Sequence, residues 1–150
     1  MPQSFACLHY HLVFGTKGRA PMLVAEWRPR LFEYLGGALR SEGGCLVAAG
    51  GTADHVHLLV RLNREVSIAD TMRSLKTNSS KWIHETIPMG AAFAWQTGYG
   101  AFTVSFSQLE VLKDYLARQE EHHRKLTFED EFRELLRLHG ISFDERYLWD

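Results

Sequence analysis

The sequence is poor in cysteine and proline and contains no long apolar run. Its two cysteines, Cys7 and Cys45, are too few for a disulfide framework and lack a metal-binding spacing, so we interpret both as small buried side chains in a reducing cytosol. Four prolines and a hydrophobic fraction of 45% exclude collagen-like and disordered chains. The apolar runs are far shorter than the roughly 20 residues of a membrane helix, and no basic segment precedes them as in a secretory signal. We therefore expect a cytoplasmic protein that does not enter a membrane.

An excess of charge of one sign is also lacking, since the net charge is −1. A globally basic nucleic-acid-binding protein is thereby excluded. Residues 1–81 nevertheless hold ten Lys and Arg against six Asp and Glu, whereas residues 82–150 hold seven against twelve. This asymmetry is compatible with a basic face for phosphates and an acidic face elsewhere.

The hydrophobic pattern predicts one α+β domain over residues 1–150. The expected elements are a strand at about 7–14, a helix at about 26–41, strands in "CLVAAGGT" and "HVHLLVRL", a helix at about 68–84, a strand at about 101–106, and helices at about 108–123 and 128–139. Ser107-x-x-Glu110 has the form of a capping box at the start of the helix at 108. The order β-α-β-β-α-β is the ferredoxin-like, RRM-like split β-α-β pattern, an antiparallel sheet with helices on one face. A C-terminal helix that bears Tyr115 follows it.

The stretch "DHVHLLV" begins a predicted strand with two histidines. Because side chains alternate along a strand, His55 and His57 share a face with their Cα atoms roughly 6.5–7 Å apart, which lets both imidazoles bind one ion. Asp54 is placed to accept a hydrogen bond from a ring N–H, as carboxylates behind metal ligands do. The alternative is two polar residues on a solvated strand face. A metal would also need a third ligand.

A candidate third ligand lies on the predicted helix "QLEVLKDYLARQEEHH". Its apolar stripe consists of Leu109, Leu112 and Leu116. Tyr115 and Gln119 are four residues apart and share a neighbouring face. Read singly, Tyr115 is an amphipathic residue at the edge of the stripe and Gln119 is a solvated one. We interpret His122 and His123, which follow in an acidic setting, as solvated.

Together these segments resemble the single-tyrosine HUH transposases of bacterial insertion sequences, the insertion-sequence-200-like group. The resemblance is carried by "DHVHLLV", "WQTGYGAFTVS", "YLARQEEHH" and "GISFDERYLW", and it runs from "YHLVFGTKGR" to the C-terminus. It places the motif histidines at His55 and His57, the nucleophile at Tyr115 and the third metal ligand at Gln119.

The resemblance implies a transposase that cleaves and rejoins single-stranded DNA at insertion-sequence ends through a 5′-phosphotyrosine on Tyr115. Two imidazoles and an amide oxygen, shared with a phosphate oxygen, suit Mg²⁺ or Mn²⁺, with Zn²⁺ as an alternative. The expected DNA partner is single-stranded and contains a hairpin. The resemblance also implies a homodimer with composite active sites, in which the tyrosine helix of one chain completes the histidine site of the other.

Further polar side chains are candidates for contact with DNA phosphates. They are Lys17 and Arg19 after the first strand, and Arg73, Lys76, Ser80 and Lys81 on the helix at 68–84. For the helix, a solvated face is the alternative.

Two other functions stay open on the residues alone. One is a non-catalytic or domesticated nucleic-acid-binding domain on the same fold. The other is a small protein with a structural metal held by His55, His57 and either His122 or His123. Tyr115 with Gln119 at the family spacing favours the transposase. A structural site would retain Zn²⁺ through dialysis, whereas a catalytic Mg²⁺ or Mn²⁺ site would lose its ion.

Overall fold

A computed structural model describes residues 3–88 and 90–149, and it contains a four-stranded antiparallel sheet in the order β2-β3-β1-β4. The strands are β1 (His9–Gly15), β2 (Cys45–Gly51), β3 (His55–Arg61) and β4 (Gly100–Val104). The α-helices are α1 (Arg28–Ser41), α2 (Ile68–Thr86), α3 (Leu109–Ala117), α4 (Gln119–His122), α5 (Phe128–Leu138) and α6 (Glu145–Leu148). Short 3-10 helices span Lys17–Arg19, Gly90–Ala92 and Phe106–Gln108. The predicted β-α-β-β-α-β order is confirmed.

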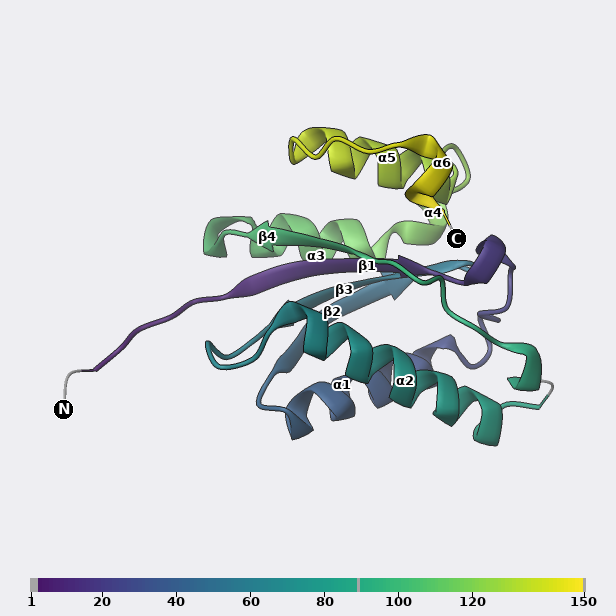
Figure 1. The fold of residues 1–150 in the computed structure, drawn as a ribbon, viewed down its shortest axis with the longest axis horizontal. Helices are drawn as coiled ribbons and strands as arrows, with labels where there is room; N and C mark the ends of the chain where they lie inside the picture. The colour runs from purple at the N-terminus through teal and green to yellow at the C-terminus, as the bar shows by residue number, and fades with distance from the viewer. Residues whose placement is uncertain (1–2, 89, 150) are drawn as a thin grey trace.

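Helices cover both faces of the sheet (Figure 1), with α1 and α2 on one face and α3, α4 and α5 on the other. Residues of β3 alternate between these layers because successive side chains of a strand point to opposite faces. The side chains packed with α1 and α2 are Val56, Leu58 and Val60. On the opposite face, Leu59 packs with Leu109 and Leu116 of α3, and His55 and His57 point the same way. The two histidines are therefore covered by helices, and the alternative of a solvated strand face is wrong.

The C-terminal helix α5 is held on the sheet by an apolar stripe. Phe128, Phe132 and Leu136 recur at helical spacing and pack against Val13 of β1 and Phe102 of β4. Thr127 caps the helix, since its side chain accepts a hydrogen bond from the backbone N–H of Asp130. Burying each large apolar side chain contributes about 1.5–3 kcal/mol to stability. The apolar stripe of α5 therefore stabilises the packing of this helix against the sheet.

Two details of the tyrosine helix differ from the prediction. The helix expected at 108–123 is interrupted at Arg118, whose φ of −107° and ψ of 24° end α3 before α4 begins. The predicted capping box does not form, because Phe106–Gln108 is a 3-10 turn that makes Gln108, and not Ser107, the residue before α3. The Ser107 hydroxyl instead pairs with the hydroxyl of Ser105.

The cysteines also differ from the interpretation given to them. Cys7 is exposed and Cys45 is half-buried, so neither is a fully buried hydrophobic residue. Among the helices in the described ranges, none has the length and apolar character needed to cross a membrane.

Candidate metal and tyrosine site

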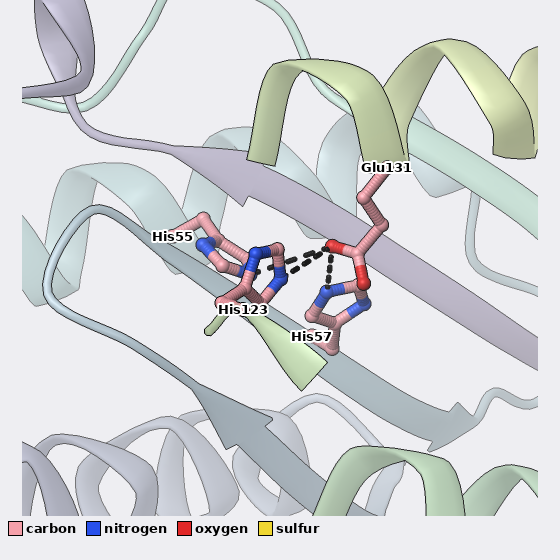
Figure 2. Close-up of side chains that lie close together, drawn as sticks. All are labelled: His55, His57, His123 and Glu131. Atoms are coloured by element: carbon pink, nitrogen blue, oxygen red, sulfur yellow. Dashed lines mark hydrogen bonds and ion pairs between the residues drawn. The ribbon is translucent and has the colours of Figure 1, made fainter. Parts of the chain in front are cut away.

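Strand β3 directs His55 and His57 to one point beneath α3 and α5. Figure 2 shows these two histidines with His123 and Glu131. Neither His55 nor His57 has any exposed surface. The Nε2 atom of His55 lies 3.1 Å from Oε1 of Gln119, and the Nε2 atom of His57 lies 2.8 Å from Oε1 of Glu131. The imidazoles of His55 and His57 therefore lie next to side-chain oxygens from α4 and α5.

Tyr115 and Gln119 reach the same point from α3 and from the first residue of α4. Gln119 is buried, and its Oε1 lies 3.0 Å from Nε2 of His123 as well as near His55. The Tyr115 hydroxyl donates a hydrogen bond to Oε2 of Glu131, and its ring meets the ring of His57 edge to face at 5.8 Å. The structure thus brings all four predicted site residues together within one chain.

A glycine of β2 lets α3 come this close to the sheet. A Cβ atom placed on Gly50 would lie 2.0 Å from the backbone carbonyl oxygen of Leu116, the residue after Tyr115. Gly50 is also paired with His57 across the β2–β3 ladder. Because only glycine leaves room for this approach, Gly50 sets the separation between the Tyr115 backbone and the histidine strand.

Two further residues belong to the site: Glu131, which was not predicted, and His123, which was named only as an alternative ligand of a structural metal. Glu131 is 2% exposed, and its Oε1 atom lies 2.8, 3.0 and 3.5 Å from the Nε2 atoms of His57, His123 and His55. The His123 side chain is only 10% exposed, so its interpretation as solvated is wrong, whereas His122 keeps a third of its side chain exposed. A sequence signal existed for Glu131, since this carboxylate falls on the buried, apolar side of α5 between Phe128 and Phe132.

Each ring of the site is held by a second contact. The Nδ1 atom of His55 donates to Oδ1 of Asp54 at 2.8 Å, which confirms the contact expected of that carboxylate. His55 also stacks on Phe128 at 4.2 Å with an interplanar angle of 7°. The Nδ1 atom of His57 lies 2.7 Å from Nε2 of His11, and these two rings stack. The orientations of the imidazoles are therefore fixed by the protein.

Burial and neighbouring groups set the charges in the site. Burial lowers the pKa of His57 to about 4 and that of His11 to about 3, so both rings are neutral at pH 7. Burial favours a raised pKa for Glu131, but hydrogen bonds from His123 and His57 outweigh it and hold this pKa well below its ordinary value. Burial, followed by the contact with Glu131, raises the pKa of Tyr115. The site therefore contains an ionised carboxylate on Glu131 next to a protonated phenol on Tyr115.

The donor atoms fit a divalent cation. Within the described part of the chain, the ligand atoms of His55, His57, His123 and Glu131 all lie within 4.8 Å of one another. We call this set the histidine–glutamate cluster. Neutral imidazole nitrogens and a carboxylate oxygen are ordinary ligands of divalent transition metals, and Gln119 adds an amide oxygen beside them.

Tyr115 lines two surface hollows of about 420 Å³ each. The polar hollow is lined by Tyr115, Arg118, Glu121, His122, Lys125 and Leu126. The more apolar hollow includes Phe102, Val104, Val111, Leu112, Leu135 and His139. The nucleophile candidate thus borders open space, whereas the histidines of β3 do not.

The candidate DNA-binding residues lie in two places. Arg73, Lys76, Ser80 and Lys81 belong to α2, which covers the sheet face opposite the histidines. The ammonium group of Lys76 donates to the carbonyl oxygens of Gln96 and Gly98, which ties α2 to the loop before β4.

Lys17 and Arg19 form the 3-10 turn after β1. Arg19 pairs with Glu129 of α5 at 3.0 Å and lies over the ring of Trp149. Contact of any of these six residues with DNA stays a prediction.

Known proteins resemble this chain in sequence and in fold. The curated ISDra2 transposase TnpA of Deinococcus radiodurans is 26% identical over 117 residues, which cover 75% of this chain and 84% of the relative. A crystal structure at 1.90 Å of a protein from Deinococcus radiodurans R1, assigned as a transposase, matches with a TM-score of 0.63 and 28% identity over 79% of this chain and 98% of that one.

A REP-associated tyrosine transposase bound to a REP hairpin has the same fold, with a TM-score of 0.61 and 13% identity over 82% of this chain and 73% of its own. The family described as IS200-like transposases matches residues 4–119, which leaves His123 and Glu131 beyond the matched residues. Because that match spans most of the chain, from before β1 to Gln119, this protein belongs to the IS200-like transposase family.

Proposed function

We propose that this transposase cleaves and rejoins single-stranded DNA in a reaction that depends on a divalent metal, with Tyr115 as the nucleophile. The observation that supports this proposal is the position of the Tyr115 hydroxyl, which is bonded to the same carboxylate that contacts His57 and His123. A buried set of metal-binding side chains beside one phenol, in a chain of this family, is suited to phosphodiester transfer.

The proposed chemistry retains the energy of the broken bond. The phenolic oxygen of Tyr115 attacks phosphorus, the bond from phosphorus to the 3′ oxygen breaks, and the leaving oxygen takes up a proton to become a 3′-OH. The phosphate remains linked to Tyr115 as a 5′-phosphotyrosine, so reversal with another 3′-OH needs no ATP. A divalent ion, when bound by His55, His57 and Gln119, would polarise the phosphate and neutralise charge that develops on it.

The burial of the histidines and of Glu131 restricts how DNA can approach them. Because His55 and His57 have no exposed surface and Glu131 is nearly covered, a scissile phosphate reaches them only when the groups that cover them shift. The polar hollow beside Tyr115 offers an approach, since Arg118 and Lys125 line it and attract a phosphate backbone.

A single strand that includes a hairpin is the proposed substrate. Attack by a tyrosine needs in-line access to a flexible backbone, which a blunt duplex denies. The relative solved with a REP hairpin has the same fold, which supports a hairpin as the recognised shape. Equal cleavage of a perfect duplex would contradict this part of the proposal.

A homodimer with shared sites is the proposed assembly. Moving an element requires two ends to be cut, and each chain carries one Tyr115. Strand β4 is an edge of the sheet with backbone groups available for pairing, and Phe106 and Val111 are exposed just beyond it. Since Tyr115 lies against the histidines of its own chain in the structure, sharing requires α3 to exchange between chains.

The test is a covalent adduct with labelled single-stranded DNA taken from the flanks of the protein's own gene. Tyr115→Phe removes only the hydroxyl, so DNA binding should persist while the adduct disappears. Tyr147→Phe is the matched control, because this tyrosine is exposed on α6 and its loss should leave the adduct unchanged. A wild-type level of adduct in Tyr115→Phe would refute the role of Tyr115. DNA binding without adduct in the wild type would favour the alternative of a non-catalytic binding domain.

A further inference from the structure

We propose that the segment beyond the family match supplies two more ligands to the divalent ion, His123 and Glu131, so that three imidazoles and a carboxylate hold it beside Gln119. This inference rests on the proposed function only in that it concerns the same ion. The match to the family ends at Gln119, and both residues follow it.

The ligand atoms of the histidine–glutamate cluster converge. Oε1 of Glu131 lies 2.8 Å from Nε2 of His57, 3.0 Å from Nε2 of His123 and 3.5 Å from Nε2 of His55 (Figure 2). These three nitrogens belong to β3 and to the turn after α4, and the oxygen belongs to α5. Three separate segments thus direct their ligand atoms to one volume, as metal sites do.

The outer ring nitrogens of His55 and His123 are hydrogen-bonded to acceptors. Nδ1 of His55 faces the carboxylate of Asp54, and Nδ1 of His123 faces the carbonyl oxygen of Leu126 at 2.6 Å. Both partners only accept, so each Nδ1 carries the proton. Without a metal, the inward Nε2 of His123 donates a hydrogen bond to Oε1 of Glu131. Loss of that proton leaves a lone pair that faces the oxygens of Gln119 and Glu131. A cation between these atoms satisfies every lone pair without adding charge to the rings.

Glu131 joins the ion site to the proposed nucleophile. One carboxylate oxygen faces the imidazoles, and the other accepts the hydrogen bond of the Tyr115 phenol. Glu131 is therefore a positioning residue for Tyr115 as well as a ligand. His57 contacts the ring of Tyr115 from the sheet side, so the phenol is held from two directions.

The donor set predicts which ion binds. A site with three imidazoles and one carboxylate prefers Mn²⁺, Co²⁺ or Zn²⁺ to Mg²⁺, because Mg²⁺ keeps oxygen ligands and much of its water. His123 and Glu131 thus shift the site from the mixed one that His55, His57 and Gln119 alone would form towards a transition-metal site. A hollow of about 440 Å³, lined by Asp54, His123 and Phe128 among others, adjoins the cluster.

The experiment titrates the metal-free full chain with Co²⁺ and follows the visible absorption of the bound ion. Glu131→Gln and His123→Asn should each weaken Co²⁺ binding by at least about tenfold, since even residues that only support ligands contribute that much. Glu134→Gln and His139→Asn are matched controls, because both residues are exposed on or just after α5. They should leave Co²⁺ binding unchanged.

Two measurements distinguish the loss of a ligand from the unfolding of a variant. Far-UV circular dichroism establishes that each variant is folded, and His123→Asn provides an independent test should Glu131→Gln disturb α5. The change in the Co²⁺ spectrum reports a lost nitrogen ligand in His123→Asn. If both folded variants bind Co²⁺ as tightly as the wild type, with unchanged spectra, the inference is overturned.

The same titration separates this inference from the proposed function. If His55→Asn abolishes Co²⁺ binding while Glu131→Gln and His123→Asn do not weaken it, the two extra ligands are refuted and the cleavage proposal is untouched. If all three variants lose Co²⁺ but the wild type forms no DNA adduct under any ion, the ligand set stands and the cleavage proposal is refuted.

Discussion

The phenol of Tyr115 on α3 donates a hydrogen bond to the carboxylate of Glu131 on α5, and Glu131 is buried whereas Tyr115 is half-buried. This contact ties the residue proposed as nucleophile to a segment that lies outside the family match. While it persists, the phenol keeps its proton, because burial and the adjacent carboxylate raise its pKa. Nucleophilic attack on DNA therefore requires this hydrogen bond to be broken or rearranged.

Removing the metal should stop cleavage without unfolding the protein. With excess chelator, the adduct between labelled single-stranded DNA and the wild type should fall to background, and added Mn²⁺ should restore it. The measurement is a denaturing gel of the adduct, with circular dichroism to confirm that the chelated protein is folded. Full cleavage in excess chelator would show that the metal proposal is wrong.

Replacing Gly50 with alanine should lower both the stability of the protein and its adduct formation. In Gly50→Ala the new methyl group collides with the Leu116 carbonyl, so α3 must shift away from β2. We expect a loss of about 1–3 kcal/mol in the free energy of unfolding and at least a tenfold loss of adduct formation. Gly37→Ala on α1 is the control, because its Cβ would contact only the flexible Arg40 side chain, at 3.7 Å. Equal activity of the two variants would contradict the role given to Gly50.

Acid should destabilise the metal-free protein through its buried histidines. The folded-state pKa values of His57 and His11, about 4 and about 3, lie below the ordinary value of 6.5, so between pH 6.5 and 4 the unfolded chain binds protons that the folded chain does not. Stability therefore falls as pH falls through this window, by on the order of 2 kcal/mol per histidine at pH 5. The raised pKa of His123 acts in the opposite direction. Thermal melts of the chelated protein at pH 7 and pH 5 measure the difference.

The control for this pH dependence is His11→Asn, which removes one of the two buried titrating rings. Its melting temperature should fall less between pH 7 and pH 5 than that of the wild type. An identical fall in both proteins would contradict the assignment to His11.

Mixing two inactive variants should reveal whether chains share their sites. His57→Gln lacks one metal ligand and Tyr115→Phe lacks the nucleophile. If α3 exchanges between partners, a heterodimer contains one site with intact histidines and an intact tyrosine, and cleavage should partly return. If each site is formed within one chain, as the structure arranges it, every site in the mixture is defective and no adduct forms. Light scattering must show a dimer for the first outcome.

Local patterns in the sequence predicted the sheet and the placement of four site residues, and the family resemblance supplied the roles of Tyr115 and Gln119. The alternation "HVHLLV" specified a strand with His55 and His57 on one face, and the spacing of Tyr115 and Gln119 specified a second set on a helix. Which helices cover which face depends on long-range packing, so the burial of His123 by the turn before α5 had no local signal. Glu131 was detectable in principle, because a carboxylate on the apolar side of an amphipathic helix costs free energy unless a partner compensates it.

The chain from Tyr115 to Glu131 folds back over the sheet, because α3 ends at Arg118 and a turn joins α4 to α5. As a result, Tyr115, Gln119, His123 and Glu131 all lie within residues 115–131, while His55 and His57 lie on β3. The candidate site is thus assembled from two peptides that are each contiguous. A chimera that receives 115–131 as a whole inherits one complete half of the site, whereas a junction placed after Gln119 separates side chains that contact one another and leaves His57 facing a foreign helix.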